Sequence, residues 1–151
     1  MKREDIHVPE IKEMYDNSLL RGGGPPAYGF GGVGFAHAIV TEGGKTLRVS
    51  GCPAVSKNGI VGKGDMAAQT WQCLDNLRIT IEAGGATWDD IVHMTFFFTD
   101  HAAFWSGCIP TRIEFFKKYS QTGKMPCVSS FGTTALMHPD MMLEIEAIVV
   151  F

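Results

Sequence analysis

The chain has 151 residues, of which 45% are hydrophobic and 19% are charged, and its formal net charge at pH 7 is −3. This length suits one domain with a single core, and the composition excludes disordered, collagen-like and membrane classes. Lysines and arginines are scattered, so no basic patch marks a phosphate backbone, and we expect no nucleic-acid partner. No apolar run approaches the roughly 18 residues that cross a bilayer, so we expect a soluble protein without a membrane partner.

The four cysteines predict a reducing compartment. Cys52, Cys73, Cys108 and Cys127 lie too far apart for a CxxC pair, and no secretory leader precedes them. We therefore expect free thiols and a cytoplasmic location.

The first 30 residues differ in character from the rest. They begin polar, pass through a short helical pattern at Ile11–Tyr15, and end in the Gly/Pro-rich stretch Arg21–Phe30. We interpret residues 1–30 as an N-terminal extension and loop, and residues 31–151 as the domain.

Two β-like runs open this domain. They cover Ala36–Thr41 and Lys45–Ser50, and Glu42-Gly43-Gly44 between them predicts a hairpin turn.

A helix follows, because Asp65 can cap it and Gly84-Gly85 can end it. Its apolar stripe is predicted from residues at three- and four-residue steps. They are Ala67, Trp71, Leu74, Leu77 and Ile81.

The second half predicts a strand, a helix and two more strands. Ile91–Thr99 is aromatic and β-branched and indicates a buried strand. A helix is expected over Ala102–Tyr119, kinked or split at Pro110, with Phe104, Ile113 and Phe116 facing inward. The last strands are predicted at Cys127–Leu136 and Met142–Val150.

This order predicts an α/β fold in which two helices cover one face of a mixed sheet. The other face also needs a cover, and the chain has sixteen Phe, Tyr and Trp residues in all. Packing between subunits is the simplest way to bury that second face.

Three segments resemble the RidA/YjgF family across residues 33–150. The first is Val49-Ser50-Gly51 followed by Cys52-Pro53. The second runs from Asp65 through Leu74-Asp75-Asn76-Leu77 and Ala83-Gly84-Gly85-Ala86 to Asp89-Asp90-Ile91-Val92. The third combines Pro126 with Leu143-Glu144-Ile145-Glu146-Ala147-Ile148.

The resemblance implies a chorismate-mutase-like fold that forms a homotrimer, with the sheets in a central barrel and a small-molecule substrate in each cleft between subunits. It also implies hydrolysis of reactive enamines and imines to a keto acid and ammonia, with no cofactor and no metal. In this chemistry an arginine holds the substrate carboxylate while a glutamate positions water.

The resemblance supports catalysis at one position and argues against it at another. Glu144 stands where the family has its water-positioning glutamate, although Glu144 and Glu146 also fit the wet face of a half-exposed strand. Val128 stands where the family has its carboxylate-binding arginine, and valine cannot make that contact. Arg48 and Arg112 are the candidate replacements, although surface arginines usually only solvate a face.

The resemblance also gives the remaining pocket residues. Ser50 matches a pocket serine, and Phe35 replaces a tyrosine of a family loop. His37 in the same loop is a candidate acid or base, although a lone histidine is more often structural. Cys52 and Cys108 replace two amide side chains and Ser130 replaces a cysteine; a nucleophilic Cys108 is a weaker alternative to a buried thiol.

Two other motifs are rejected. Residues 29–34 fit GxGxxG, but they follow a loop rather than a strand and lead into β-like sequence. His93, Asp100 and His101 lack a second close pair of metal ligands.

Three functions remain open. The leading hypothesis is a deaminase-like hydrolase of a small enamine, imine or conjugated amino compound. The alternative is a trimeric binding or regulatory module without turnover, because Val128 replaces the anchor. Ribonuclease activity is disfavoured by the acidic charge.

Overall fold

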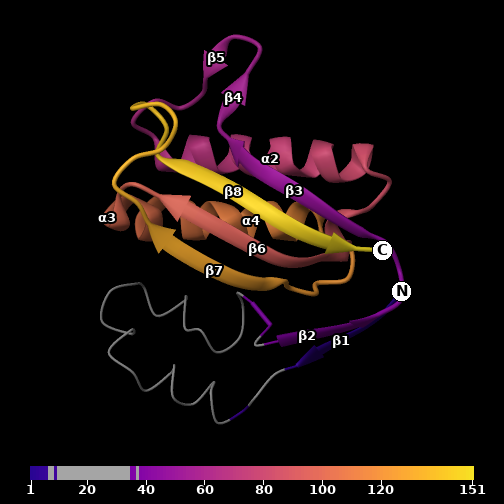
Figure 1. The fold of residues 1–151 in the computed structure, drawn as a ribbon. Coiled ribbons are helices and arrows are strands. Elements are labelled where there is room, and N and C mark those ends of the chain that lie inside the picture. The colour runs from indigo at the N-terminus through magenta and orange to yellow at the C-terminus, as the bar shows by residue number, and fades with distance from the viewer. Residues whose placement is uncertain (7–8, 10–34, 37) are drawn as a thin grey trace.

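The protein is built around a four-stranded mixed sheet (Figure 1). The computed structural model describes residues 1–6, 9, 35–36 and 38–151. The strand order is β3-β8-β6-β7; β8 is antiparallel to β3 and β6, whereas β6 and β7 are parallel. These strands are Thr46–Pro53 (β3), Ile91–Phe98 (β6), Cys127–Gly132 (β7) and Leu143–Val150 (β8).

Both long helices lie on the same face of this sheet, behind it in the view of Figure 1. They are α2, Met66–Ala83, and α4, Ile109–Tyr119. The carboxylate of Asp65 accepts a hydrogen bond of 3.0 Å from the backbone N–H of Ala68, which caps α2 as predicted. The predicted α/β fold, with two helices over one face of a mixed sheet, is confirmed.

The buried stripe of α2 differs from the predicted one. Ala67 and Trp71 are exposed, while Gln69 and Thr70 are fully buried. Gln69 faces inward because its amide is satisfied there: it donates to the carbonyl of Asp140 at 2.7 Å and accepts from the N–H of Met142 at 2.8 Å. Polar groups with hydrogen-bond partners can replace apolar ones in a core.

The second helical segment is divided in three. A short helix, α3, covers His101–Ala103; a π-helix, η4, covers Phe104–Cys108; and α4 follows, with Pro110 in its first turn. A missing N–H costs little in a first turn, so Pro110 separates α4 from the preceding turns as expected.

The inward face of this segment matches the prediction at two of three positions. Phe104 and Phe116 are buried as predicted, but Ile113 is only half-buried. Phe115 is fully buried instead, because the inward stripe follows Cys108 and Arg112 at three- and four-residue steps.

The predicted hairpin is wrong, although both of its strands exist. Gly43 and Gly44 do turn the chain, with φ of 71° and 89°. However, β2 (Ala38–Glu42) pairs with β1 (Lys2–Ile6) in a separate two-stranded sheet, while β3 pairs with β8. The backbone of Lys45 exchanges hydrogen bonds with Phe151, which commits β3 to the C-terminal strand.

Smaller elements complete the description. Residues 133–136, which were predicted as strand, lie beyond β7. A two-residue pair, β4 (Val55–Ser56) and β5 (Gly59–Ile60), forms a small hairpin, and η3 (Trp88–Asp90) leads into β6. The helical pattern at Ile11–Tyr15 lies outside the described residues.

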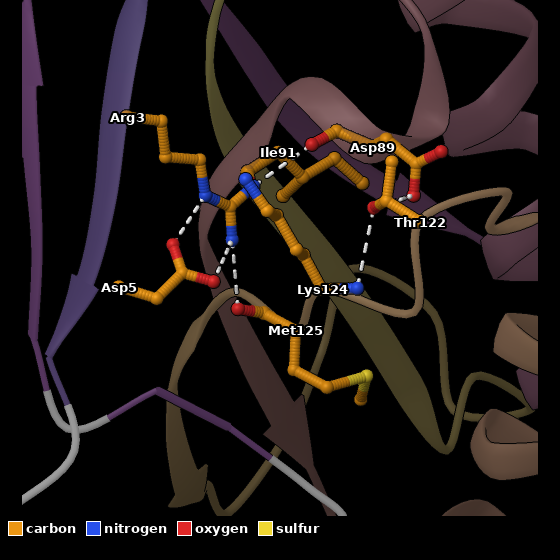
Figure 2. A network of polar contacts seen from close by, with 7 residues as sticks. All are labelled: Arg3, Asp5, Asp89, Ile91, Thr122, Lys124 and Met125. Atoms are coloured by element: carbon orange, nitrogen blue, oxygen red, sulfur yellow. Dashed lines mark hydrogen bonds and ion pairs between the residues drawn. The ribbon is translucent and has the colours of Figure 1, made fainter.

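Arg3 joins the small sheet to the large one (Figure 2). Its guanidinium donates to the backbone carbonyls of Asp89, Ile91 and Met125 at 2.8, 3.1 and 2.9 Å, just before and at the start of β6 and just before β7. It also pairs with Asp5, with 2.6 Å between Nε and Oδ1. The Arg3 side chain is only 5% exposed, so these contacts replace water at a buried cation.

The Asp89 side chain organises the neighbouring loop. Burial acts to raise its pKa, but hydrogen bonds from the Ser120 hydroxyl, the Gln121 N–H and the Thr122 hydroxyl outweigh it, and the pKa is lowered. Asp89 therefore has two roles. Its carboxylate accepts hydrogen bonds from this loop, and its backbone carbonyl accepts one from Arg3.

We predict that Arg3→Met lowers the free energy of unfolding by about 3–5 kcal/mol, because it leaves a buried carboxylate and three carbonyls without their donor. Chemical denaturation followed by circular dichroism measures this. Lys2→Met is the matched control, since Lys2 is 79% exposed and should change stability little. Equal effects of both substitutions would contradict the structural role of Arg3.

Candidate functional site

Glu144 lies in β8 on the face of the sheet that the helices leave open. Leu143 and Ile145 on either side are fully buried toward the helices, so the alternation of the strand turns Glu144 the other way. In the ladder it lies opposite Phe97 of β6 and Pro53 of β3. Its side chain is half-buried.

The pairing of β3 with β8 is interrupted beside Glu144. The register shifts between Val49 and Cys52, which leaves Ser50 and Gly51 in an irregular turn of the strand. A Cβ atom on residue 51 would lie 2.6 Å from Cδ and 2.8 Å from Cγ of Glu144. The carboxylate therefore lies directly over the backbone of Gly51, in a space that any other residue would fill.

Ser50 and Cys52 flank this position. Ser50 is exposed, and the Cys52 thiol donates to its carbonyl at 3.5 Å. Burial raises the pKa of Cys52, and hydrogen bonding to Thr80 only partly offsets it. We call Ser50, Gly51 and Glu144 the Glu144 cluster; two of the predicted site residues meet in it, whereas Cys52 pairs with the buried Ile145 and packs against the core on the helix side.

Three other predicted residues lie on the helix side of the sheet. Val128 and Ser130 of β7 pair with Met94 and Phe96 of β6, whose side chains are fully buried under the helices. Val128 packs against the core, and Ser130 is exposed at the edge strand.

Cys108, the third of these residues, is fully buried at the end of η4. Burial raises its pKa to about 11, although a hydrogen bond with Thr70 and the charge of Arg112 act in the opposite direction. The thiol is therefore protonated at neutral pH, which argues against Cys108 as a nucleophile.

Of the two predicted residues of the family loop, the structure describes Phe35. Phe35 is half-buried, and the N–H of the following Ala36 donates to the carbonyl of Pro126 at 3.0 Å, at the entrance to β7. His37 lies outside the described residues, and its role as acid or base stays a prediction.

The predicted site residues thus form two separate groups. The Glu144 cluster and the pair Val128 and Ser130 lie two strands apart, on opposite faces of the sheet. One chain alone does not direct both groups into one pocket, and their roles in binding stay predictions.

Arg112 is the residue whose position the sequence reasoning misjudged. It is 5% exposed, on the inward face of α4, and its guanidinium carbon lies 5.6 Å from the ring centroid of Phe96. Burial lowers its pKa. The signal was present in the sequence, because Arg112 follows Cys108 by four residues and precedes Phe116 by four, on one helical face. Arg48, the other candidate, is exposed.

The histidines considered for metal binding have other contacts. His93 Nε2 shares a hydrogen bond of 3.3 Å with the Ser129 hydroxyl, and His101 Nε2 accepts one of 3.0 Å from Trp105. In the described ranges, no three His, Cys, Asp or Glu side chains gather as metal ligands do.

Comparison with known proteins identifies the family. A family model described as Endoribonuclease L-PSP matches residues 33–151. The chain belongs to this family. The YjgF gene product of E. coli, a solved structure, is 32% identical, with 85% of this chain and 93% of that one covered and a TM-score of 0.63. The predicted membership of the RidA/YjgF family is confirmed.

Two further solved structures of the family are similar to the chain. YyfB from Yersinia pestis, described as a conserved Rid family protein of unknown function, covers 100% of both chains at 27% identity and a TM-score of 0.75. TdcF from E. coli, solved with bound serine, is 27% identical over 80% of this chain and 91% of that one, with a TM-score of 0.64.

No curated protein matches the chain significantly. Among the described helices of this RidA/YjgF protein, none has the length and apolar character to span a membrane.

We predict that the four free cysteines differ in reactivity. At pH 8, Cys73 and Cys108 should react with iodoacetamide at least about tenfold more slowly than the half-exposed Cys127, because they are buried and their pKa values are strongly raised. Mass spectrometry of timed digests measures this, and in urea all four should react alike. Faster alkylation of Cys108 than of Cys127 would restore it as a candidate nucleophile.

Proposed function

We propose that the protein is a cytoplasmic, cofactor-free hydrolase that releases ammonia from a small enamine, imine or conjugated amino compound, in clefts between the subunits of a homotrimer. The observation that carries this proposal is the carboxylate of Glu144 over the bare backbone of Gly51. Backbone groups and a carboxylate side by side suit the positioning of a water molecule.

The reaction needs only orientation and proton transfer. An enamine first tautomerises to its imine. The oxygen of water then bonds to the imine carbon while Glu144 takes a proton from that water. Glu144 returns the proton to nitrogen, which gives a carbinolamine. Glu144 then carries the proton of the hydroxyl group to the same nitrogen, the C–N bond breaks with its electrons passing to nitrogen, and ammonia leaves as the C–O bond becomes a carbonyl. An imine and one water thus give one carbonyl compound and one ammonia.

A small ligand with an amino acid character fits this proposal. TdcF, a member of the same family at 27% identity, was solved with bound serine. The description of the family as an endoribonuclease fits less well, because the net charge of −3 offers little attraction to RNA.

The alternative is a trimeric module that binds a small molecule or regulates a partner without turnover. Val128 favours it, because an apolar side chain stands where the family resemblance implies an arginine. Tight binding of a small molecule without product would support this alternative.

We predict that Glu144→Gln slows ammonia release from 2-aminoacrylate, generated in situ, by about 100-fold or more, the effect expected for loss of a general base. Glu146→Gln is the matched control, since Glu146 shares the strand and the face, but the carboxylate that lies over Gly51 is that of Glu144. Gly51→Ala should mimic Glu144→Gln, because the added methyl group displaces the carboxylate.

The same assay on the wild-type protein decides between the two functions. Release no faster than in buffer, for 2-aminoacrylate and for aminomuconate-like compounds, would reject the hydrolase and leave the binding module.

The homotrimer has its own support on the helix-free face of the sheet, here defined by Phe97, Phe131 and Ile148. Phe97 and Phe131 stack with 6.0 Å between ring centroids, and Phe131 is 54% exposed. Exposed aromatic surface of this kind is typical of an interface between subunits.

We predict that the wild-type chain sediments at three times the monomer mass at micromolar concentration, and that Ile148→Asp shifts it toward the monomer, because a charge is costly in an apolar interface. Ile79→Asp is the matched control, because Ile79 is 52% exposed on α2, on the other side of the sheet. A wild-type protein that sediments only as a monomer would reject the clefts between subunits.

A further inference from the structure

The strand β3 loses part of its ladder where it passes Glu144. Its pairing with β8 is regular up to Val49, and the register then shifts before Cys52. Pro53, the partner of Glu144 in the ladder, has no N–H to donate. A bulge followed by a proline weakens the ladder on this stretch of the strand. The backbone of Gly51, over which the Glu144 carboxylate lies, therefore needs another contact to hold it.

Asn76 of α2 supplies such a contact. Its Nδ2 donates two hydrogen bonds of 2.9 Å each, one to the carbonyl of Pro53 and one to the carbonyl of Val55. Ala54, between these two carbonyls, is fully buried. The corner at which β3 ends and the hairpin of β4 and β5 begins (Figure 1) is thus fastened to α2.

The orientation of the Asn76 amide is fixed as well. Its Oδ1 accepts a hydrogen bond of 2.8 Å from Nε2 of Gln72, one helical turn earlier. Both ends of the amide therefore have partners. An ionised carboxylate of the same size has no hydrogen to give, so Asp at this position would place acceptor oxygens against two carbonyls. The arrangement requires an amide, and not merely a polar side chain of this length.

We propose that Asn76 is a positioning residue for the hydrolysis, because it holds the corner at Pro53–Val55 and thereby keeps the backbone of Gly51 in place beside the Glu144 carboxylate. This inference rests on the proposed function for the reaction that it assists. Asn76 acts from α2 through the strand and not by contact with the substrate. A misplacement of about 1 Å can cost about 100-fold in rate, so a contact away from the chemistry can control it.

Steady-state ammonia release from 2-aminoacrylate, generated in situ, tests this role. Asn76→Asp should lower kcat about 10- to 100-fold and change KM less than about threefold, because the displaced groups act mainly on the transition state. Asn58→Asp is the matched control, since Asn58 is exposed in the turn between β4 and β5, and should leave both constants unchanged. An equal loss in the two variants would overturn the inference. An active wild type whose kcat survives Asn76→Asp would also overturn it and leave the hydrolase standing.

A double-mutant cycle separates positioning from a merely structural role. In the Glu144→Gln background, Asn76→Asp should lower the residual rate by less than about twofold, because the carboxylate that it serves has been removed. A residue that only stabilised the fold would lower the rate by the same factor in both backgrounds, and that result would overturn the inference. Should Asn76→Asp fail to fold, Gln72→Met replaces it in the cycle, since it removes only the donor that orients the amide.

A crystal structure of Asn76→Asp, or of Gln72→Met in its place, does not depend on turnover. The backbone of Gly51 should be displaced relative to residue 144, and an unmoved Gly51 would overturn the inference. A displaced Gly51, in a protein whose wild type releases no ammonia, would retain Asn76 as the residue that sets the geometry of the Glu144 cluster and would remove the hydrolase.

Discussion

The alternation of side chains along β8 divides the molecule into two chemically different faces. Leu143, Ile145, Ala147 and Val149 are buried against the helices, while Glu144 and Glu146 point the other way. Because β8 pairs on both sides, its register also sets the orientation of β3 and β6. A slip of one residue would bring the carboxylates into the core, so the core itself holds Glu144 in place.

Local patterns in the sequence were enough to predict most of the fold. The cap at Asp65 and the strict alternation of the last strand are short-range signals, and the structure has both as predicted. The pairing of β2 with β1 was not predictable in this way, because the polar residues 2–6 show no apolar periodicity and the turn at Gly43 resembles that of a hairpin. Arg3 fixes that pairing through carbonyls that are more than 80 residues away in the sequence.

The candidate site was less predictable than the fold, for a physical reason. A resemblance identifies positions, such as Glu144 and Val128, but it does not tell which face of the sheet each side chain occupies in this chain. Gly51 belongs to the motif on which the resemblance rests. Its role follows only from the structure, in which the Glu144 carboxylate lies over its backbone. Arg112 was judged as a surface residue because most arginines are, whereas the packing of α4 on β6 determines that it is buried.

The π-helical turn of η4 constrains the length of the chain around it. A π-helical turn holds one residue more than an α-helical turn. In this chain the extra residue lies in Phe104–Cys108, between the cap at Asp100 and the start of α4. Removing one residue there would restore an ordinary helix but rotate everything after it by about 100°. Arg112 would then leave the ring of Phe96 and turn toward the flank of the helix, so the extra residue of η4 is what brings this cation over β6.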